Sequence, residues 1–324
     1  MNAILGTLLT LGLLASCGER INLEQVTRLH LSDYFVDETV KHLESKTVAK
    51  WATPSLRGTN KIVLTFDDGP GPYTAELLDI LKTWNEENPD NTIAATFFVL
   101  GQNLRAYQDV ALRALAEGHI LASHDWDHTD NNLEIESTFK TGMTKTLQEL
   151  DRLYRLSGKD FSHNYFRFPY GNYGKNSSYH HFDSMLALGN EIFGFNCLNY
   201  VFWDLDTSDW VQGISSEQVA QNLWAFLPVT PDKTFYDRQK VDGKWVLTSR
   251  TINKYEIGGG ISLMHDVHLS SVKAIGLFLA RVQAFNLAVE KSEDKIQFTS
   301  LTEVKEYSYP DDLNCILKPE LQVE

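Results

Sequence analysis

Short runs of apolar residues alternate with longer amphipathic segments from Lys61 to near the C-terminus. The short runs favour buried strands, and the longer segments repeat their apolar residues at helical spacing. Seven strands that alternate with helices indicate a parallel sheet, and this number suits a barrel-like closure. The predicted strands are Lys61–Phe66, Ala94–Leu100, Ile120–Ser123, Tyr165–Phe168, Tyr200–Asp204, Ile261–His265 and Ile296–Ser300. The predicted helices are Thr74–Asn85, Leu104–Glu117, Glu136–Leu156, Ser178–Phe193, Ser216–Phe226 and Ser271–Leu287.

One polar segment, residues 230–255, interrupts this alternation before the sixth strand. It runs from Thr230 to Tyr255 and contains the turn-forming pair Asp242-Gly243. The pattern predicts a loop or a small hairpin, with Trp245–Leu247 in one arm. Such an insertion either shapes access to a site at the strand ends or lies on the surface away from that site. The sequence leaves both possibilities open.

The N-terminal segment has the pattern of an export signal. The apolar stretch Ala3–Leu14 has the length of a signal-peptide core and is short for a bilayer span. It ends in Leu14-Ala15-Ser16-Cys17, which resembles the lipobox of bacterial lipoproteins. We therefore expect residues 1–16 to be a signal peptide, Cys17 to be the lipidation site, and residues 17–56 to be an N-terminal extension or linker. The expected location is the bacterial cell envelope, in the periplasm or at the outer membrane; a buried N-terminal helix with an incidental cysteine is the alternative.

Charge and cysteine content narrow the set of partners. The 324-residue chain has a formal net charge of −14 and lacks a run of basic residues, which argues against a nucleic-acid partner. We expect contact with a membrane only through a lipid anchor at Cys17. Cys197 and Cys315 would then remain, and export would permit a disulfide between them, but the sequence does not show whether they meet.

Charged and imidazole side chains recur where the predicted strands end. In a parallel barrel these ends share one face, where active sites form. Residues that lie two hundred positions apart can therefore converge there. The residues so placed are Asp67, Asp68, His124, Arg167, Asp204, Asp206, Asp209 and His265.

Two of these segments offer ligands for a metal ion. Asp67 and Asp68 follow the first strand, and His124 and His128 stand four positions apart, either on a helix or at the edges of a turn. One carboxylate with two histidines suits a catalytic divalent metal and leaves a coordination position open. The remaining carboxylate could act as a base.

Three later segments add groups for acid–base chemistry. Arg167, at a strand end, can pair with a carboxylate and keep it ionised. Asp209 offers a further carboxylate beside the aromatic Trp210. His265 ends an apolar strand, a position that suits a general acid.

These five segments resemble, in order and spacing, the five motifs of the polysaccharide deacetylases, carbohydrate esterase family 4, also called the NodB-homology domain. The resemblance spans residues 57–302 and leaves residues 303–324 as a C-terminal tail. It implies a distorted (β/α) barrel that removes acetyl groups from N-acetylated sugars. It also implies one divalent metal ion, zinc in preference to cobalt or manganese. The segments are Thr65–Pro70, His124–His128, Phe166–Gly171, Asp206–Trp210 and Ile261–His265.

The resemblance also assigns roles to individual residues. Asp68, His124 and His128 would hold the metal, and Asp67 would be the base that activates the attacking water. Arg167 would tether Asp67.

The resemblance further assigns an oxyanion donor, an acid and a pocket. The Tyr170 backbone N–H would help to stabilise the oxyanion. His265, oriented by Asp209, would protonate the leaving amine, and Trp210 and Leu263 would wall the pocket for the acetyl methyl.

Asp125 departs from the family pattern, which commonly has Ser or Thr after the first histidine. Its charge could strengthen cation binding, perturb the loop, or be neutral in effect through exposure to solvent.

The sequence thus predicts an N-deacetylase of N-acetylglucosamine-type residues in a cell-wall polysaccharide. Peptidoglycan is favoured because a bacterial envelope lipoprotein would meet it. The alternatives are a chitin or chitooligosaccharide deacetylase and a catalytically inactive carbohydrate-binding protein of the same fold. A glycoside hydrolase that uses Asp67 with another carboxylate is a further alternative.

Overall fold

The computed structural model describes residues 53–161, 164–174, 181–194, 198–254, 256–308 and 316–324. The predicted signal peptide, Cys17 and most of the N-terminal extension lie outside these residues. So do Cys197 and Cys315. The predictions made for them stay predictions.

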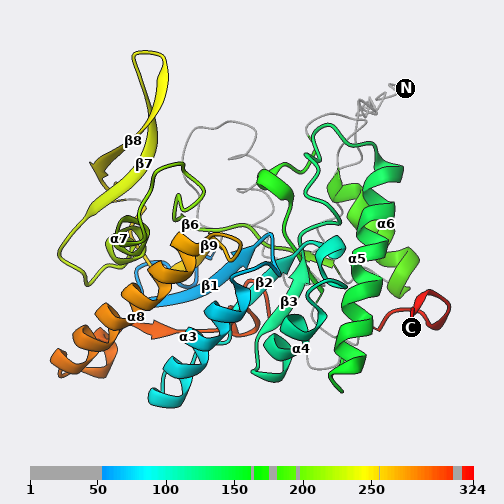
Figure 1. The fold of residues 1–324 in the computed structure, drawn as a ribbon, viewed down its shortest axis with the longest axis horizontal. Coiled ribbons are helices and arrows are strands. Elements are labelled where there is room, and N and C mark those ends of the chain that lie inside the picture. Colours follow the sequence, from blue (N-terminus) through cyan, green and yellow to red (C-terminus); the bar gives the residue numbers. More distant parts are fainter. Residues whose placement is uncertain (1–52, 162–163, 175–180, 195–197, 255, 309–315) are drawn as a thin grey trace, which may run out of the picture.

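A curled parallel sheet forms the centre of the molecule (Figure 1). Seven strands follow the order β5-β4-β3-β2-β1-β9-β6, and β10 pairs with β1 off this path. The predicted barrel-like sheet of about seven parallel strands is therefore confirmed. The strands are β1 (Lys61–Asp67), β2 (Thr96–Val99), β3 (Ile120–Ser123), β4 (Asn164–Phe166), β5 (Leu198–Tyr200), β6 (Leu205–Asp206), β9 (Gly260–His265) and β10 (Gln297–Phe298).

Helices pack side by side around this sheet, in the contact order α7-α8-α3-α4-α5-α6. Both α5 and α7 have the bounds that the sequence predicts. The chain reaches α4 four residues later than predicted, because it first makes a 3₁₀ turn, Gly101–Asn103, that is tied by hydrogen bonds to the loop after β3. The helices are α3 (Thr74–Glu87), α4 (Gln108–Ala116), α5 (Glu136–Leu156), α6 (His181–Phe193), α7 (Ser216–Phe226) and α8 (Leu269–Ala288).

The prediction of a single strand over Tyr200–Asp204 is wrong. β5 ends at Tyr200, β6 begins at Leu205, and the two strands lie at opposite ends of the sheet path. Residues 201–204 cross between them. The Val201 N–H donates to the Phe166 carbonyl at 2.7 Å, and the Asp204 N–H donates to the Ile261 carbonyl at 2.9 Å. This crossing segment, rather than a continuous strand, links the two ends of the curled sheet.

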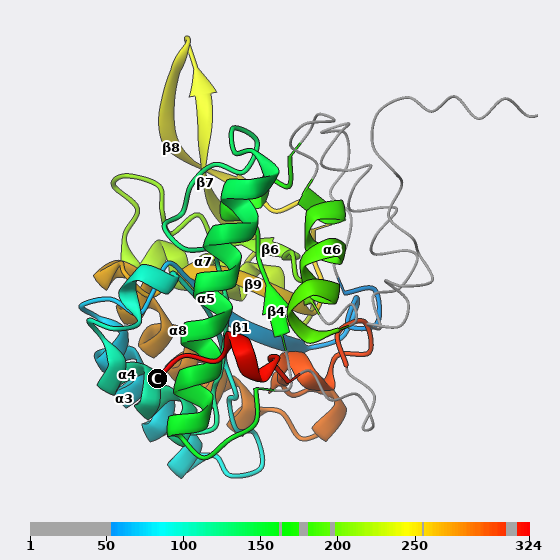
Figure 2. The ribbon, with the colours of Figure 1, turned by 90° about the vertical axis from the view of Figure 1, so that its right-hand side faces the viewer.

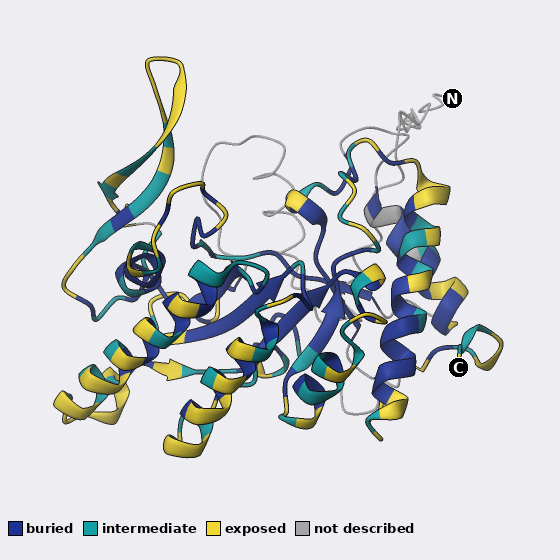
Figure 3. Ribbon diagram, viewed as in Figure 1, coloured by how far each residue is buried: buried dark blue, intermediate teal, exposed yellow. Residues whose placement is uncertain are grey.

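An aromatic cluster fills the space between the sheet and α5. The strands β1–β5 and β9 are buried along most of their length, whereas the helices are exposed on their outer sides (Figure 3). Phe139 of α5 is fully buried, and its ring centroid lies 5.9 Å from that of Phe166, 6.1 Å from that of Phe168 and 4.3 Å from that of His181. This cluster fixes α5 and α6 against the strands that carry the chain toward the site.

The insertion before β9 is an antiparallel hairpin that projects beyond the barrel (Figures 1 and 2). It consists of β7 (Thr234–Val241) and β8 (Lys244–Thr251). The two turn residues, Asp242 and Gly243, have φ angles of 49° and 78°. Two left-handed residues in succession are typical of a type I′ turn, which matches the twist of the flanking strands. The predicted hairpin is present, with Trp245–Leu247 in β8.

The last residues of the chain pack against the helices. After a 3₁₀ turn at Pro319–Leu321, the Leu321 carbonyl accepts a hydrogen bond from Gln148 at 2.8 Å. The Val323 carbonyl accepts one from Arg155 at 2.6 Å. Both donors lie on α5, so the described part of the C-terminal tail is attached to the barrel. Among the described residues, no helix is long and apolar enough to cross a membrane.

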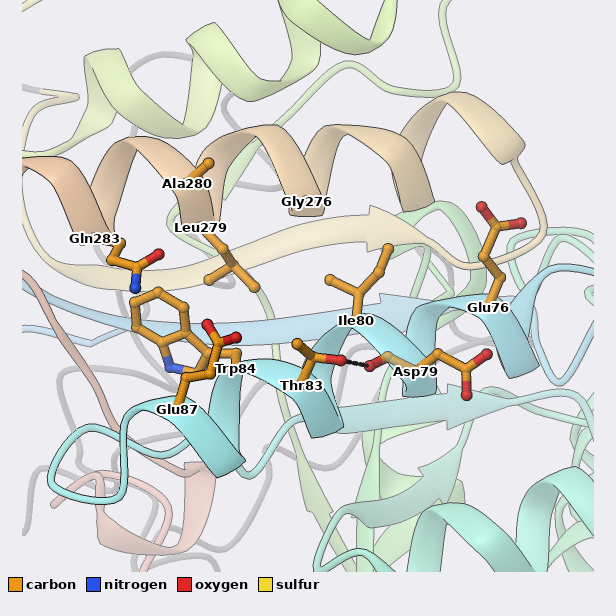
Figure 4. Close-up of a pocket in the computed structure, with 10 residues that line it drawn as sticks. All are labelled: Glu76, Asp79, Ile80, Thr83, Trp84, Glu87, Gly276, Leu279, Ala280 and Gln283. Atoms are coloured by element: carbon orange, nitrogen blue, oxygen red, sulfur yellow. Dashed lines mark hydrogen bonds between the residues drawn. The ribbon is translucent and has the colours of Figure 1, made fainter.

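A groove separates α3 from α8 on the outer surface (Figure 4). Ile80 of α3 lies opposite Gly276 of α8, and Leu279 of α8 lies above Trp84 toward one end. None of the residues predicted to form the active site lines this groove. It is a feature of helix packing outside the barrel.

We expect Phe139→Ala to destabilise the fold by about 3–5 kcal/mol, because it leaves a cavity under three aromatic neighbours. Urea unfolding measures the loss. Leu156→Ala on the same helix is the matched control, since Leu156 is 58% exposed and surface substitutions change stability by about 0.5 kcal/mol or less. Equal losses for the two variants would contradict this account of the core.

Candidate active site

The side chains at the ends of β1 and β3 converge on one point. The Oδ1 atom of Asp68 lies 3.2 Å from Nε2 of His128 and 3.5 Å from Nε2 of His124. Ligand atoms of these three residues all lie within 4.8 Å of one another. The convergence that the sequence predicts for Asp68, His124 and His128 is therefore present.

The backbone at these residues adopts conformations that are rare outside glycine. Asp68, Asp125 and His128 have φ angles of 73°, 68° and 64°. His124 and His128 thus lie at the edges of an irregular loop, and the helical alternative is wrong. Left-handed conformations of non-glycine residues are costly, and they gather where the surrounding structure imposes a particular side-chain direction. Here they aim a carboxylate and an imidazole at one another.

The chemistry of the three side chains fits a divalent cation. Burial lowers the pKa of His124 to about 3, so the imidazole is neutral, as a metal ligand must be. Its Nδ1 lies 2.8 Å from the Arg167 carbonyl oxygen, which assigns the proton to Nδ1 and leaves the Nε2 lone pair toward Asp68. Oδ1 of Asp68 is buried and lacks a hydrogen-bond donor among the described residues. A cation would satisfy that oxygen.

Asp67 is held by a buried arginine. Nη1 of Arg167 donates to Oδ1 of Asp67 at 2.7 Å and to the Thr65 hydroxyl at 2.8 Å. The other carboxylate oxygen of Asp67 lies 3.8 Å from Nε2 of His124. Burial raises the pKa of the Asp67 carboxyl, and the charge of Arg167 opposes this rise. Asp67 is thus a buried carboxylate with a raised pKa beside the candidate metal ligands.

Thr65 is a partner that the sequence analysis missed. Its hydroxyl accepts from Arg167 and donates to the Ser262 carbonyl on β9. A threonine within an apolar strand gives no signal of this role, because threonine is also favoured in strands for its shape.

Across the site, Asp209 holds His265. Nδ1 of His265 lies 2.8 Å from one carboxylate oxygen of Asp209, and the His265 backbone N–H donates to the other at 2.7 Å. Burial lowers the pKa of His265, but Asp209, with Asp67 and Asp68, outweighs it and raises this pKa to about 10. His265 is therefore protonated at neutral pH.

Ser271 supports the same carboxylate. Its hydroxyl donates to Asp209 at 2.5 Å from the first turn of α8. The bond fixes Asp209 from a third direction, beside the two bonds from His265. A serine near a helix start is common for local reasons, so this contact was not predictable from the sequence.

Asp204 and Asp206, which the sequence predicts at the strand ends beside Asp209, do not lie together there. Asp204 accepts hydrogen bonds from the backbone N–H groups of Thr53 and Ile261, at the beginning of β9 rather than at its end. The prediction that it lies at the catalytic face is wrong, because the strand assumed to carry it is interrupted. Asp206 accepts from the indole N–H of Trp210 at 3.1 Å and fixes that ring.

The remaining predicted residues border the site. Tyr170 has a φ of 58°, and its ring meets that of His128 edge-on at a centroid distance of 4.4 Å. Leu263 is buried on β9, whereas Trp210 is partly exposed beside Asp209. These positions are consistent with a pocket rim, and the roles of Tyr170, Trp210 and Leu263 stay predictions.

Asp125 points away from solvent. It is buried, and it accepts hydrogen bonds from the side chain of Asn131 at 3.0 Å and from the Trp126 N–H at 2.8 Å. The alternative that Asp125 is exposed to solvent, so that its charge has no effect on the site, is wrong. Asn131 also donates to Glu134 at 2.8 Å, so Asp125 belongs to a polar network that shapes the histidine loop.

Asp266 is a further carboxylate that the sequence analysis missed. It is buried directly behind Gly69, where a side chain on the glycine would collide with it. The Thr74 hydroxyl donates to it, and burial raises its pKa to about 7. The close approach explains the glycine after Asp68. The only sequence feature that could have pointed to Asp266 is its place directly after His265.

The pairing of His265 with Asp209 makes stability depend on pH. Because the pKa of His265 in the folded state lies near 10, above the ordinary 6.5, its contribution is full below pH about 6.5 and is lost as the pH rises toward 10. Urea unfolding of chelator-treated wild type and Asp209→Asn tests this. We expect the wild type to have the larger free energy of unfolding at pH 6.5, and the difference from Asp209→Asn to shrink toward pH 10. A gap that stays constant over this range would contradict the assignment.

Comparison with known proteins agrees with this geometry. Residues 57–182 match the family model described as polysaccharide deacetylase. A peptidoglycan-N-acetylglucosamine deacetylase of Bacillus cereus is 29% identical over 166 residues, which cover 50% of each chain. A chitin deacetylase of Pestalotiopsis sp. is 31% identical over 220 residues, which cover 67% of this chain and 56% of that protein. The chain thus spans about half the length of these two curated relatives.

A solved structure supports the same relationship. It is the catalytic domain of a peptidoglycan N-acetylglucosamine deacetylase from Eubacterium rectale, with a TM-score of 0.51 and 25% identity. The alignment covers 82% of this chain and 98% of that one. Together with the arrangement of Asp67, Asp68, His124 and His128, these matches place residues 57–182 in the polysaccharide deacetylase family.

Proposed function

We propose that the protein is a metal-dependent N-deacetylase that hydrolyses the acetamido group of N-acetylglucosamine-type residues and releases acetate. One observation carries this proposal. The metal-ligand set Asp68, His124 and His128 lies between a carboxylate fixed by Arg167 and an imidazolium fixed by Asp209. Amide hydrolysis needs these parts, because water must lose a proton and the amine must gain one.

Asp67 is the proposed base. Its hydrogen bond to Arg167 fixes one carboxylate oxygen and leaves the other on the side of His124. A carboxylate that is buried next to the ligand set can take the proton of water as the water attacks the acetamido carbon. Arg167 is fully buried, so it holds Asp67 without competing for substrate.

His265 is the proposed acid. Its imidazolium is stabilised by the charge of Asp209 and by the hydrogen bond from Nδ1 to one carboxylate oxygen, while the His265 backbone N–H donates to the other oxygen and fixes the carboxylate beside the ring. Nδ1 is engaged by Asp209, which leaves the proton on Nε2 for the departing amine. Transfer of that proton makes the leaving group a neutral amine.

The three proposed ligands would bind a divalent ion, for which we propose zinc because two imidazoles with one carboxylate suit it. The chemistry that such an ion supplies is Lewis-acid polarisation of the amide carbonyl and acidification of water. The Tyr170 backbone N–H would add a fixed donor for the oxyanion, which is typically worth roughly 3 kcal/mol.

We infer that peptidoglycan is the substrate and the cell envelope is the location. The support for the location is the apolar N-terminus that ends at Cys17, and a protein anchored there would meet peptidoglycan. The relatives support either polymer, since one is named a peptidoglycan-N-acetylglucosamine deacetylase and another a chitin deacetylase. A chitin-type substrate is therefore the second candidate.

Replacement of the base tests the mechanism. We expect Asp67→Asn to lower acetate release from N-acetylglucosamine oligomers by about 10²- to 10⁴-fold, while elemental analysis still finds the metal. Asp90→Asn, at an exposed position in the turn after α3, is the matched control and should keep full activity. A variant at Asp67 with near-normal turnover would remove this residue from the base role.

Removal of the metal tests the ligand set. We expect a chelator to abolish acetate release and added Zn²⁺ or Co²⁺ to restore it. In His124→Ala the same ions should fail to restore activity, because one of three ligands is missing. Full activity in a metal-stripped sample would refute the metal mechanism.

A further inference from the structure

The hairpin β7–β8 is rigidly attached to the barrel at its base. The side chain of Asn222 on α7 donates to the Tyr236 carbonyl and accepts from the Tyr236 N–H, both at 2.7 Å. Arg250 makes two hydrogen bonds of 2.8 Å to Glu256. A buried amide that satisfies both backbone groups of one strand residue fixes the direction of the strand. The outer half of the hairpin is thereby held in a defined place while its side chains remain exposed (Figure 3).

One arginine of the hairpin lies between two tryptophans. The guanidinium carbon of Arg238 is 4.9 Å from the Trp210 ring centroid and 4.7 Å from that of Trp245. These are cation–π distances, so the arginine orients both rings. Even so, Trp210 remains 41% exposed and Trp245 remains 58% exposed. Two indoles that are ordered but open to solvent form a ready surface for a ligand.

The strand register places the cationic and aromatic groups on one face. Lys240 is directly opposite Trp245, and Arg238 is two residues before Lys240. Side chains alternate between the faces of a strand, so these three share a face, and Val246 lies on the other. This face is continuous with the active site, because Trp210 follows Asp209, the residue that holds His265.

We propose that Trp245 and Arg238 form an extended subsite that binds sugar rings of the same glycan strand, next to the residue that is deacetylated. This inference rests on the proposed function. The apolar faces of pyranose rings pack on indoles, and the guanidinium and ammonium groups offer donors to hydroxyl and carboxylate oxygens. The hairpin thus serves to engage a polymer, and Trp210 joins its surface to the catalytic pocket.

Chain-length dependence tests this subsite. We expect Trp245→Ala to lower kcat/KM for the N-acetylglucosamine hexamer by about five- to tenfold, the loss of one aromatic contact, and to change that for the dimer by less than about twofold on the same basis. The loss for the hexamer should lie in KM. Val246→Ala, on the opposite face, is the matched control and should leave both substrates unchanged. Trp245→Phe should recover most of the loss.

Two outcomes would overturn the inference. Equal losses for dimer and hexamer would show that Trp245 only supports the fold. An unchanged kcat/KM for the hexamer would show that this surface does not contact the glycan.

A binding measurement separates this inference from the proposed function. The affinity for the hexamer is measured by calorimetric titration into two proteins, the variant Asp67→Asn and the double variant that also carries Trp245→Ala. If the wild type releases no acetate but Trp245→Ala weakens hexamer binding about five- to tenfold, the subsite stands and the proposed function fails. If the wild type releases acetate and hexamer binding is unaffected by Trp245→Ala, the proposed function stands and the subsite is refuted. A protein that binds no hexamer refutes the subsite.

Discussion

The buried guanidinium of Arg167 is the contact on which both the fold and the site depend. It bonds to Asp67 and Thr65 on β1 and to the Val201 and Phe202 carbonyls in the segment that crosses the open side of the sheet. A buried charge without partners is very costly, so these acceptors must be in place together. The backbone oxygen of the same residue orients His124, a proposed metal ligand. The end of one short strand therefore fixes the proposed base, one proposed ligand and the linkage of the sheet ends.

The site keeps its two imidazoles in different protonation states by giving them different neighbours. Burial keeps His124 neutral, which suits a ligand, and the hydrogen bond to the Arg167 carbonyl orients its ring. His265 is also buried, but the charge of Asp209, the hydrogen bond that the ring Nδ1–H donates to it, and the charges of Asp67 and Asp68 keep the imidazole protonated, which suits an acid. Opposite protonation states of one residue type across a small site are the arrangement that amide hydrolysis requires.

The sequence predicts the site better than it predicts some of the fold around it. The convergence of the site residues was predictable because strand ends in a parallel sheet meet on one face. The ligand set and the Arg167–Asp67 and His265–Asp209 pairs came from the resemblance to the polysaccharide deacetylases. The end of β5 at Tyr200 was not predictable, because an apolar run looks the same in the sequence whether it pairs in a strand or crosses between the two ends of the sheet. Thr65, Ser271 and Asp266 were missed because their roles come from partners that lie far away in the sequence.

The central claim is that this geometry removes acetyl groups and leaves the glycan backbone intact. Mass spectrometry of the products from peptidoglycan fragments and from chitin oligomers, incubated with the same preparation, tests it most directly. The account predicts products that have lost acetyl groups while the number of sugars in each chain is unchanged. Shortened chains would indicate a glycoside hydrolase, and unchanged masses with both substrates would indicate a carbohydrate-binding protein; either result would contradict the account.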